Sequence, residues 1–590
     1  LRTRNMYTAP AMSELLQLAV MRSRFILRTR ILGGIFVLAA LLIVARLYFV
    51  QIVRGAAYQR DATAQYVQAS SDTESRSSIF FSTKDGEPIS AAVMQTGWRI
   101  AIKPKDILEP DLVYERLNAE TPIDRDRFFT SVAKKGDPYE EIAFRVPDDA
   151  AAKIRARAIP GVLLVSDQWR FYPAHELAAH VLGFIGFKGN TRTGVYGLEK
   201  SWQDVLLTTS SGLYMNPFAE IFMNIEAAVT TDPSARKGSI ITSIEPRIQA
   251  KLEKTLDGVM ETYTPNIAGG IIMDPHTGEI VAMAVRPTFD PNTYNTESNV
   301  AVFSNPLVEN IYEMGSIMKP LTMAAGIDMG VVTPKTTYKD RGCIEKSGKK
   351  ICNYDGRARG VVSMQEVLNQ SLNTGVSFVV DKMGHEVFGR YVEGFQLGAR
   401  TEIDLPNEAK GRIQAIQDGY DVDYASASFG QGIAVSAIGM IRALAALANG
   451  GVMPDPHIVK AMKYGTGITR DIELKEGLRV FSATTTETVT RMLATVYDDA
   501  LLKGVLKEEH YSIAAKTGTA QIAVPGGSGY YADRFLHSFF GYFPAYDPKF
   551  IIFLFAVEPH GAEFASATLA HPFSDITKYM INYYDIPPDR

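Results

Sequence analysis

A long apolar run lies near the start of the chain, from residue 31 to residue 53, and only Arg46 and Gln51 interrupt it. A helix of this length can cross a bilayer. Arginines crowd the ten residues before it, and a basic flank marks the cytoplasmic side. A cleaved signal peptide is the alternative, but its apolar core is usually shorter and the residues after 53 offer a poor cleavage site. The pattern predicts a cytoplasmic tail (1–30), a transmembrane helix (31–53) and an exported remainder.

Residues 54–235 alternate between strand-like pieces such as "GWRIAIKP" and charged helical pieces such as "DDAAAKIRARA". This mixture predicts a first exported domain over 54–235. The stretch "TTDPSARKGS" (230–239) combines turn formers with charge before an apolar run, which is typical of a boundary. A second domain is therefore expected over 236–590.

The apolar pattern of the second domain is sharper. An amphipathic helix is indicated by apolar residues at helical spacing, namely Ile248, Leu252, Leu256 and Val259. "GGIIMDPHTGEIVAMAV" indicates two strands with a turn between them. A helix-rich stretch over about 316–450, three strands within 511–559 and a closing helix over 574–584 follow. This order predicts an α/β (α+β) sandwich with an all-helical insertion.

Composition narrows the function. The chain has 590 residues, 46% apolar and 21% charged, with a net charge of −4, so packed cores are expected and no basic domain suggests nucleic-acid binding. The string "HELAAH" resembles a zinc-protease helix, but its His175 and His180 are five positions apart and would point about 140° apart on a helix. With scattered histidines and two cysteines, no metal site and no cofactor are predicted.

The stretch "EMGSIMKP" places Ser316 one helical turn before Lys319. The same spacing occurs at Ser131/Lys134, Ser234/Lys237 and Ser347/Lys350. Ser316 differs from these because a glycine precedes it and an apolar helix-forming stretch follows. Proline at 320 is tolerated in a first helical turn, which predicts a helix beginning at about Ser316, with serine and lysine on one face beside the positive end of the helix dipole.

Two further pieces follow in order. "QSLNTG" supplies Ser371 and Asn373, and "AAKTGTA" supplies Lys516, Thr517, Gly518 and Thr519 on an expected strand. A glycine there lets another backbone lie close, as a peptide adding along a strand edge requires. Each piece alone has a plain explanation, a helix cap or a strand end. Together the three pieces form an ordered trio: Ser316 with Lys319, then Ser371 with Asn373, then the Lys-Thr-Gly run. This order favours nucleophilic catalysis.

The two cysteines lie in "CIEKSGKKIC" (343–352). A two-residue turn at Ser347-Gly348 would pair Cys343 with Cys352 across a non-hydrogen-bonded position, where side chains are closest. Export favours oxidation, so a disulfide-closed hairpin is predicted; two free thiols are the alternative.

The trio resembles the S-x-x-K, S-x-N and K-T-G signature of the penicillin-binding protein and serine β-lactamase superfamily. The blocks at 274–292, 428–451 and 538–559 are similar to its transpeptidase domain, and "RFYPAHELAAHVLGFIG" with "GVYGLEKSWQDVL" is similar to the pedestal of class B penicillin-binding proteins. The resemblance covers about residues 70–585. It departs at "RSSIFFSTKDGEPIS", which matches the usual arginine-glycine start loosely, and at "EMGS" in place of Pro-Gly-Ser.

The resemblance implies a peptidoglycan D,D-transpeptidase inhibited by β-lactams, with an antiparallel sheet flanked by helices and an all-helical subdomain on the pedestal. It implies that Ser316 attacks the bond between two D-alanines of a stem peptide and that Lys319 takes the serine proton. Ser371 and Lys516 would relay a proton to the leaving D-alanine, and Asn373 would bind the substrate amide. Backbone N–H groups of Ser316 and Thr519 would form the oxyanion hole, and Thr517, Gly518 and Thr519 would hold the substrate.

The alternatives are a membrane-anchored serine β-lactamase and a catalytically silent β-lactam sensor or division scaffold. The chain contains no Glu-x-x-Leu-Asn string for a class A deacylating base, and the complete trio disfavours a dead enzyme. Because class B members lack glycan polymerase activity, a membrane polymerase of the SEDS family is the expected partner, with other division or elongation proteins of the bacterial cytoplasmic membrane.

Lys319 should be neutral when Ser316 reacts, because a protonated amine cannot accept a proton. The like charge of Lys516 and the nearby helix end should lower its pKa, and burial would add to the effect. The alternative is that Lys319 stays protonated and only orients Ser316, and that Ser371 takes part in removing the serine proton instead.

Overall fold

The computed structural model describes residues 41, 75–188, 191–208, 237–417, 419–464, 468–524, 526 and 529–590. The predicted membrane helix lies outside these residues except for Leu41, and the boundary predicted at residues 235 and 236 lies outside them too. No helix in these ranges is long and apolar enough to cross a membrane. The chain forms two compact units, whose described parts are Gly97–Asp167 in the smaller and 75–96 with Gln168–Arg590 in the larger. The predicted domain division therefore stays a prediction.

The smaller unit is a small α/β body. Its strands are the end of β3 (Pro88–Ile102), β4 (Glu140–Val146) and the start of β5 (Val162–Phe171), and its helices are α3 (Pro110–Asn118), α4 (Arg125–Ala133) and α5 (Asp148–Ala156). Ile100, Leu117, Phe128 and Ala151 are fully buried between them. The Asp124 carboxylate caps α4 by accepting from the Arg127 N–H.

A five-stranded sheet is the centre of the larger unit. Its strands are β10 (Ile267–Met273), β11 (Ile280–Arg286), β20 (Ala514–Ala523), β21 (Tyr530–Phe543) and β22 (Phe550–Val557). They pair antiparallel in the order β11-β10-β22-β21-β20. The strands predicted at these positions are confirmed, and β20 is an edge strand.

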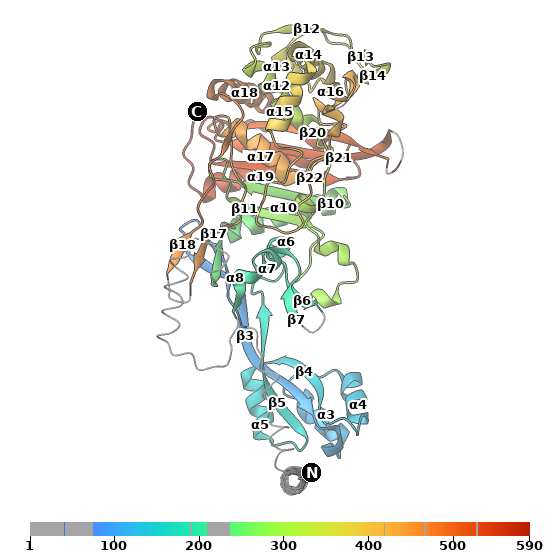
Figure 1. Cartoon of the computed structure of the whole chain (residues 1–590), viewed down its shortest axis with the longest axis vertical. Helices are drawn as coiled ribbons and strands as arrows, with labels where there is room; N and C mark the ends of the chain where they lie inside the picture. Colours follow the sequence, from blue (N-terminus) through green and yellow to red (C-terminus); the bar gives the residue numbers. More distant parts are fainter. Residues whose placement is uncertain are drawn as a thin grey trace, which may run out of the picture. The chain divides into compact units, whose positions relative to one another are not determined.

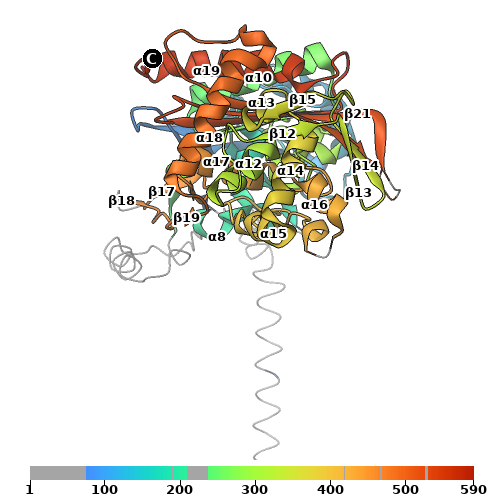
Figure 2. The same cartoon turned by 90° about the horizontal axis from the view of Figure 1, so that it is seen from above.

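Helices cover both faces of this sheet, which explains why β22 reads as a continuous apolar run. Helices α10 (Pro246–Tyr263) and α19 (Ala565–Tyr583) pack together on one face. Helix α17 (Ala437–Ala448), which is buried along most of its length, packs against β22 from the other. Figure 2 shows α10 and α19 on one side of β21 and α12, α14 and α17 on the other.

The closing helix starts nine residues before the predicted position 574. Pro572 lies inside α19, although proline lacks the N–H that a helix interior uses. The first turns form nevertheless, since Ala565, Leu569 and Ala570 are fully buried against the sheet. Tertiary packing here outweighs the local cost of the proline.

The segment between β11 and β20 carries most of the remaining helices (Figure 1). They are α11 (Pro306–Glu309), α12 (Lys319–Asp328), α13 (Met364–Asn369), α14 (Asn373–Met383), α15 (His385–Gly394), α16 (Asp421–Ala427), α17 and α18 (Ala483–Thr495). The segment is not all-helical as predicted, because it includes two ribbons. Strand β12 (Thr337–Asp340) pairs with β15 (Gly360–Ser363), and β13 (Cys343–Lys346) pairs with β14 (Lys349–Cys352).

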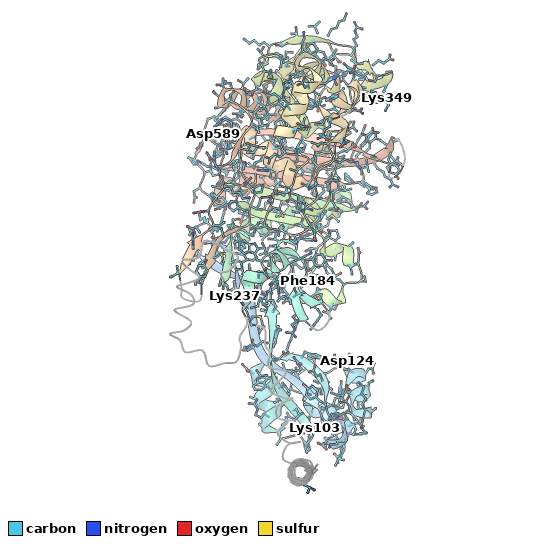
Figure 3. All side chains as sticks on the ribbon, in the orientation of Figure 1. Lys103, Asp124, Phe184, Lys237, Lys349 and Asp589 are labelled. Carbon is cyan, nitrogen blue, oxygen red and sulfur yellow. A yellow bond between two sulfur atoms is a disulfide. The ribbon has the colours of Figure 1, made fainter. Side chains whose placement is uncertain are left out.

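A second sheet in the larger unit joins early and late parts of the chain. Strand β9 (Ser239–Thr242) lies between β2 (Ile79–Ser82) and β17 (Val459–Lys463), and β18 (Thr469–Asp471) flanks β17. Short elements pack nearby, namely β1 (Ser75–Arg76), α6 (Ala179–Leu182), β6 (Ile185–Lys188), β7 (Thr191–Gly194), α7 (Gly197–Ser201), α8 (Gln203–Leu206) and β8 (Leu207–Thr208). Phe184, labelled in Figure 3, stacks on Tyr294 with ring centroids 4.2 Å apart.

A buried ion cluster ties these elements together. The Glu199 carboxylate, fully buried, accepts from Arg76 Nε at 2.5 Å and from Arg170 Nε at 2.7 Å. Arg76 also donates to the Glu199 backbone carbonyl and to Gln203. The segment that departs from the usual pedestal start thus supplies a central arginine. The two histidines of "HELAAH" have separate partners: His175 contacts Asp290, and His180 contacts the Val302 carbonyl.

Candidate active site

Ser316 lies on a short 3-10 turn, Gly315–Met318, and α12 begins at Lys319. The predicted helix start at Ser316 is therefore three residues early. Pro320 explains the difference, because it occupies the first turn of α12, where its missing N–H costs nothing, while the preceding turn is wound more tightly. Ser316 is half-buried and Lys319 is fully buried.

Three glycines let backbones meet behind Ser316. Gly315 has φ +64°, and a Cβ on Gly430 would lie 2.3 Å from the Gly315 carbonyl oxygen. A Cβ on Gly518 would lie 2.4 Å from the Ser538 Oγ and 2.8 Å from the Met314 carbonyl oxygen. Ser538 Oγ donates to that same carbonyl at 2.9 Å. Gly518 does let another backbone lie close, but that backbone is the nucleophile turn itself. The expected approach of a peptide substrate at this strand stays a prediction.

The Lys319 amine reaches the second piece of the trio. Its Nζ donates to the Ser371 backbone carbonyl at 2.5 Å and to Ser371 Oγ at 3.2 Å. Within the described residues it makes no hydrogen bond to the Ser316 hydroxyl. Ser371 itself has φ +55°, an uncommon backbone conformation for a residue other than glycine.

The Lys516 amine approaches the same hydroxyl. Its Nζ lies 3.1 Å from Ser371 Oγ and 3.0 Å from the Thr517 carbonyl oxygen. Lys516 is buried. The structure therefore brings Lys319, Ser371 and Lys516 together around one oxygen, from three segments far apart in the sequence.

Burial and mutual repulsion weaken the proton affinity of these amines. Desolvation lowers the pKa of Lys319 well below its usual value, and the Lys516 charge lowers it further. Burial lowers the pKa of Lys516 to about 7. The predicted lowering of the Lys319 pKa is thus reproduced, but burial, rather than the neighbouring charge, is its largest cause.

Asn373 begins α14 and faces the cysteine hairpin. Its side-chain Nδ2 donates to the Cys352 carbonyl at 2.9 Å. The hairpin register is the predicted one, with Cys343 opposite Cys352 and Lys346 opposite Lys349. Ser347 and Gly348 form its turn with φ +46° and +73°, and the two cysteines form a disulfide.

The Lys-Thr-Gly run lies on β20, at the free edge of the five-stranded sheet. Thr517 and Thr519 lie on this edge strand just after Lys516, and both are half-buried. The Thr519 hydroxyl accepts from the Ala565 N–H at 3.1 Å. It retains its own O–H for donation to a ligand, because a hydroxyl both donates and accepts. A strand edge with no further partner strand among the described residues is also what strand addition of a peptide requires.

The other Ser-x-x-Lys pairs are not sites of this kind. Ser131 and Lys134 both bind the Glu140 carboxylate in the smaller unit. Ser347 is an exposed turn residue, and Ser234 lies outside the described residues.

Sequence reasoning missed Glu313, three residues before Ser316. Its Oε2 is buried without a hydrogen-bond partner among the described residues. Burial raises the pKa of this carboxyl, and the Tyr530 hydroxyl and the Gly432 backbone contact it. A carboxylate inside the apolar stretch "NIYEMGSIM" was the signal available, since charged side chains are rarely buried.

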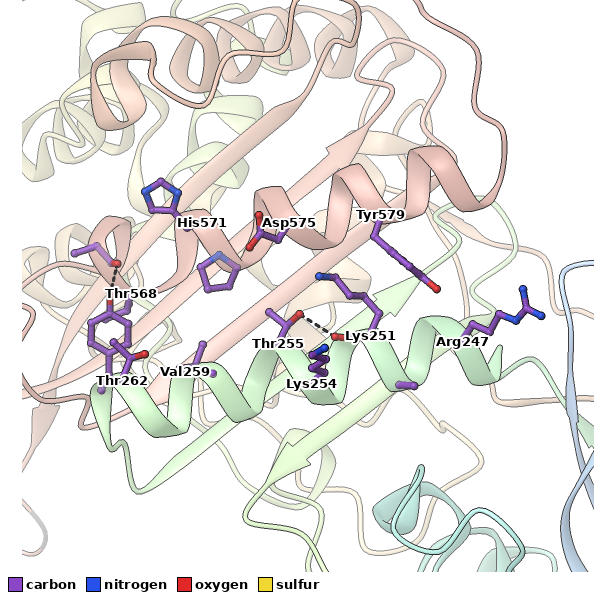
Figure 4. Close-up of a pocket in the computed structure, with 15 residues that line it drawn as sticks. Arg247, Lys251, Lys254, Thr255, Val259, Thr262, Thr568, His571, Asp575 and Tyr579 are labelled. Carbon is purple, nitrogen blue, oxygen red and sulfur yellow. Dashed lines mark hydrogen bonds between the residues drawn. The ribbon is translucent and has the colours of Figure 1, made fainter.

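A hollow of about 760 Å³ lies elsewhere, between α10 and α19 (Figure 4). Arg247, Lys251 and Lys254 line it from α10, and His571, Asp575 and Tyr579 line it from α19. It contains no member of the trio and lies on the sheet face opposite α17.

Comparisons with known proteins agree with this arrangement. Residues 268–578 match the penicillin-binding protein transpeptidase domain, and residues 56–216 match the penicillin-binding protein dimerisation domain. Stage V sporulation protein D of Bacillus subtilis is 26% identical over 91% of this chain and 82% of its own length. Peptidoglycan D,D-transpeptidase FtsI of Escherichia coli is 25% identical over 95% of this chain and 92% of its own. The apo crystal structure of penicillin-binding protein 3 from Mycobacterium tuberculosis is 26% identical, with a TM-score of 0.64 over 72% of this chain and 92% of that one.

Proposed function

This chain belongs to the penicillin-binding protein transpeptidase family and carries the dimerisation domain of its class B members, and on that premise we propose that it crosslinks peptidoglycan stem peptides as a D,D-transpeptidase. One observation carries the proposal: two buried lysine amines converge on the Ser371 hydroxyl beside the Ser316 turn and the free edge of β20. In this cluster a proton can pass between Lys319 Nζ, Ser371 Oγ and Lys516 Nζ along the hydrogen bonds that join them.

The acylation step uses Ser316 as the nucleophile. Neutral Lys319 takes the hydroxyl proton while Ser316 Oγ bonds to the carbonyl carbon between two D-alanines. The resulting oxyanion is stabilised by the backbone N–H groups of Ser316 and Thr519. When the C–N bond breaks, Ser371 passes a proton to the departing amine, and Lys516 assists. An ester on Ser316 and free D-alanine result.

The second step transfers the acyl group. An amine from a neighbouring stem peptide attacks the ester carbonyl, the new amide forms, and Ser316 recovers its proton. Attack by water would instead give carboxypeptidase activity. Release of D-alanine with and without an amine acceptor distinguishes the two outcomes.

Substrate binding follows from the edge strand. An extended peptide can add along β20, with its terminal carboxylate near Thr517, Thr519 and the charge on Lys516. Asn373 offers its amide oxygen and one N–H to the peptide backbone. A β-lactam would occupy the same place, because its strained amide presents a carbonyl to Ser316.

Labelling with a fluorescent penicillin tests the assignment. Wild type should label, and Ser316→Ala should not. Persistent labelling of that variant, or labelling at Ser347, would show that another nucleophile acts. Steady-state hydrolysis of penicillin tests the β-lactamase alternative, which requires rapid turnover rather than a lasting acyl-enzyme.

We also propose that residues 31–53 anchor the protein in the bacterial cytoplasmic membrane, with the catalytic domain outside the cytoplasm. The Cys343–Cys352 disulfide supports exposure to an oxidising compartment. A SEDS-family polymerase is the proposed partner in cell division or elongation. Exchange of residues 31–53 for an unrelated anchor should impair complementation while penicillin binding survives. Intact complementation would mean that this segment is only a membrane tether. The location of a fluorescent fusion, at the septum or along the sidewall, would show whether the protein acts in division or in elongation.

A further inference from the structure

A hydrogen bond joins the cysteine hairpin to the active site, from Asn373 Nδ2 to the Cys352 carbonyl. A carbonyl only accepts, so this contact fixes which end of the carboxamide faces the hairpin. The Asn373 oxygen and its second N–H remain for a substrate amide. The orientation of a substrate-binding group therefore depends on where the Cys352 carbonyl lies.

Few contacts besides the disulfide hold that carbonyl in place: Lys346 pairs with Asp381 of α14 at 2.6 Å, and the Asn353 N–H donates to the Gly342 carbonyl at 2.8 Å. Most of its ten residues are exposed or half-buried, and Ile351 is the one residue of 343–352 that is buried. Lys349, labelled in Figure 3, is exposed at the turn end. A two-stranded hairpin of this size is marginally stable alone. The disulfide closes its base at the residue that carries the acceptor carbonyl.

A buried hydrogen-bond network holds Asn353, which follows Cys352, and Thr374, which follows Asn373. The Thr374 N–H donates to Asn353 Oδ1 at 3.3 Å, and the Thr374 hydroxyl donates to Asp340 Oδ1 at 2.7 Å. Asn353 Nδ2 also donates to both Asp340 oxygens at 3.1 Å. This network secures the chain after Cys352, whereas the disulfide secures the Cys352 strand to β13. The network therefore holds the hairpin base beside the first turn of α14, and the disulfide holds the two strands of that base together.

We propose that the Cys343–Cys352 disulfide is a positioning element of the active site, which holds the Cys352 carbonyl against Asn373 and thereby orients the Asn373 amide for substrate. The proposal rests on the transpeptidase function proposed above. Without the bridge, the hairpin base moves away from α14, and Asn373 samples orientations that do not match the substrate.

The test removes the bridge and measures acylation. The variant Cys343→Ser/Cys352→Ser keeps the size of both side chains, and its rate of acylation by a fluorescent penicillin should fall roughly ten- to hundredfold, the range expected for a misplaced positioning group. Lys349→Ala, at the turn end of the same hairpin, is the matched control and should acylate like wild type.

A double-mutant cycle separates positioning from general destabilisation. If the disulfide acts through Asn373, its removal in an Asn373→Ala background should change the rate by less than about twofold, because the group it positions is already absent. An equal loss in both backgrounds would overturn the proposal, as would an undiminished rate in the serine variant. A wild type that does not label at all would instead refute the proposed function.

The wild-type protein gives the same comparison if the serine variant does not fold. Mass spectrometry of exported protein without reductant should find no alkylatable thiol, and two thiols would overturn the proposal. A water-soluble phosphine then reduces the bridge to two thiols while the phosphine takes oxygen from water. Acylation should slow and should recover on reoxidation. An unchanged rate with both thiols free would also refute the positioning role.

Discussion

Lys319 and Lys516 donate to the same oxygen, Ser371 Oγ, from 3.2 Å and 3.1 Å. Their nitrogens can therefore be no more than about 6 Å apart, and two unit charges at that separation repel by roughly 3 kcal/mol at an effective dielectric constant near 20. Burial penalises each charge as well. The pair favours a state in which at least one amine is neutral, as a general base must be.

The rate of acylation should therefore depend on pH in a defined direction. Because the pKa of Lys319 is lowered, its neutral fraction increases with pH through a value well below the 10.4 of free lysine. Acylation by penicillin, measured by stopped flow, should rise with pH over that range. Lys319→Arg should be nearly inactive, since a guanidinium stays protonated. Acylation of that variant within tenfold of wild type would favour the permanent-cation alternative.

The Ser371 hydroxyl should be required for proton transfer. Ser371→Ala removes the oxygen that both amines contact, and acylation should fall about 10²- to 10⁴-fold, the usual contribution of general acid–base catalysis. Ser131→Ala provides a control at a serine of the same Ser-x-x-Lys spacing, and its acylation rate should equal that of wild type. A Ser371→Ala enzyme that retains most of its rate would show that protons take another route.

Gly518 should tolerate no side chain. A methyl group there would meet Ser538 Oγ at 2.4 Å and the Met314 carbonyl oxygen at 2.8 Å, so Gly518→Ala should push β20 away from the Ser316 turn and reduce penicillin labelling at least tenfold. Adding Ser538→Ala relieves the closer clash and should restore part of the labelling.

Gly258 on α10 is the matched control, because a Cβ there meets nothing within 4 Å. Gly258→Ala should label normally and gain up to about 1 kcal/mol of stability from helix propensity. Normal labelling of Gly518→Ala would mean that the strand and the turn adjust independently.

The buried cluster around Glu199 should dominate the stability of its surroundings. Glu199→Gln leaves the Arg76 and Arg170 guanidiniums without a buried counter-charge, which typically costs about 3–5 kcal/mol. A lower urea midpoint, followed by circular dichroism, would measure this loss. Glu402→Gln at the exposed Lys475 pair is the control, with an expected change below about 1 kcal/mol. Equal midpoints for both variants would contradict the structural role.

Local patterns predicted the elements better than their ends. Alternation and turn residues indicated β10, β11 and the β13–β14 register, because these depend on neighbours in the sequence. The start of α19 and the 3-10 turn at Ser316 depend on packing against β20 and β21, which no local pattern reveals. The trio could be recognised by spacing, but the meeting of Lys319 with Ser371 spans 52 positions. The link from Asn373 to Cys352 needed the folded chain, whereas Glu313 could have been noticed as a carboxylate within an apolar stretch.

The described stretch Gly97–Asp167 of the smaller unit is joined to the larger unit at both ends, through β3 and β5, and these two strands pair with each other. Segments whose two ends lie close together are often tolerated as exchangeable insertions. We predict that residues 97–167, the described part of the smaller unit apart from Leu41, can be exchanged while the five-stranded sheet stays folded. A short loop between residues 96 and 168 would give a trimmed catalytic protein for crystallography, and a reporter domain spliced at that junction would leave every strand of the five-stranded sheet intact.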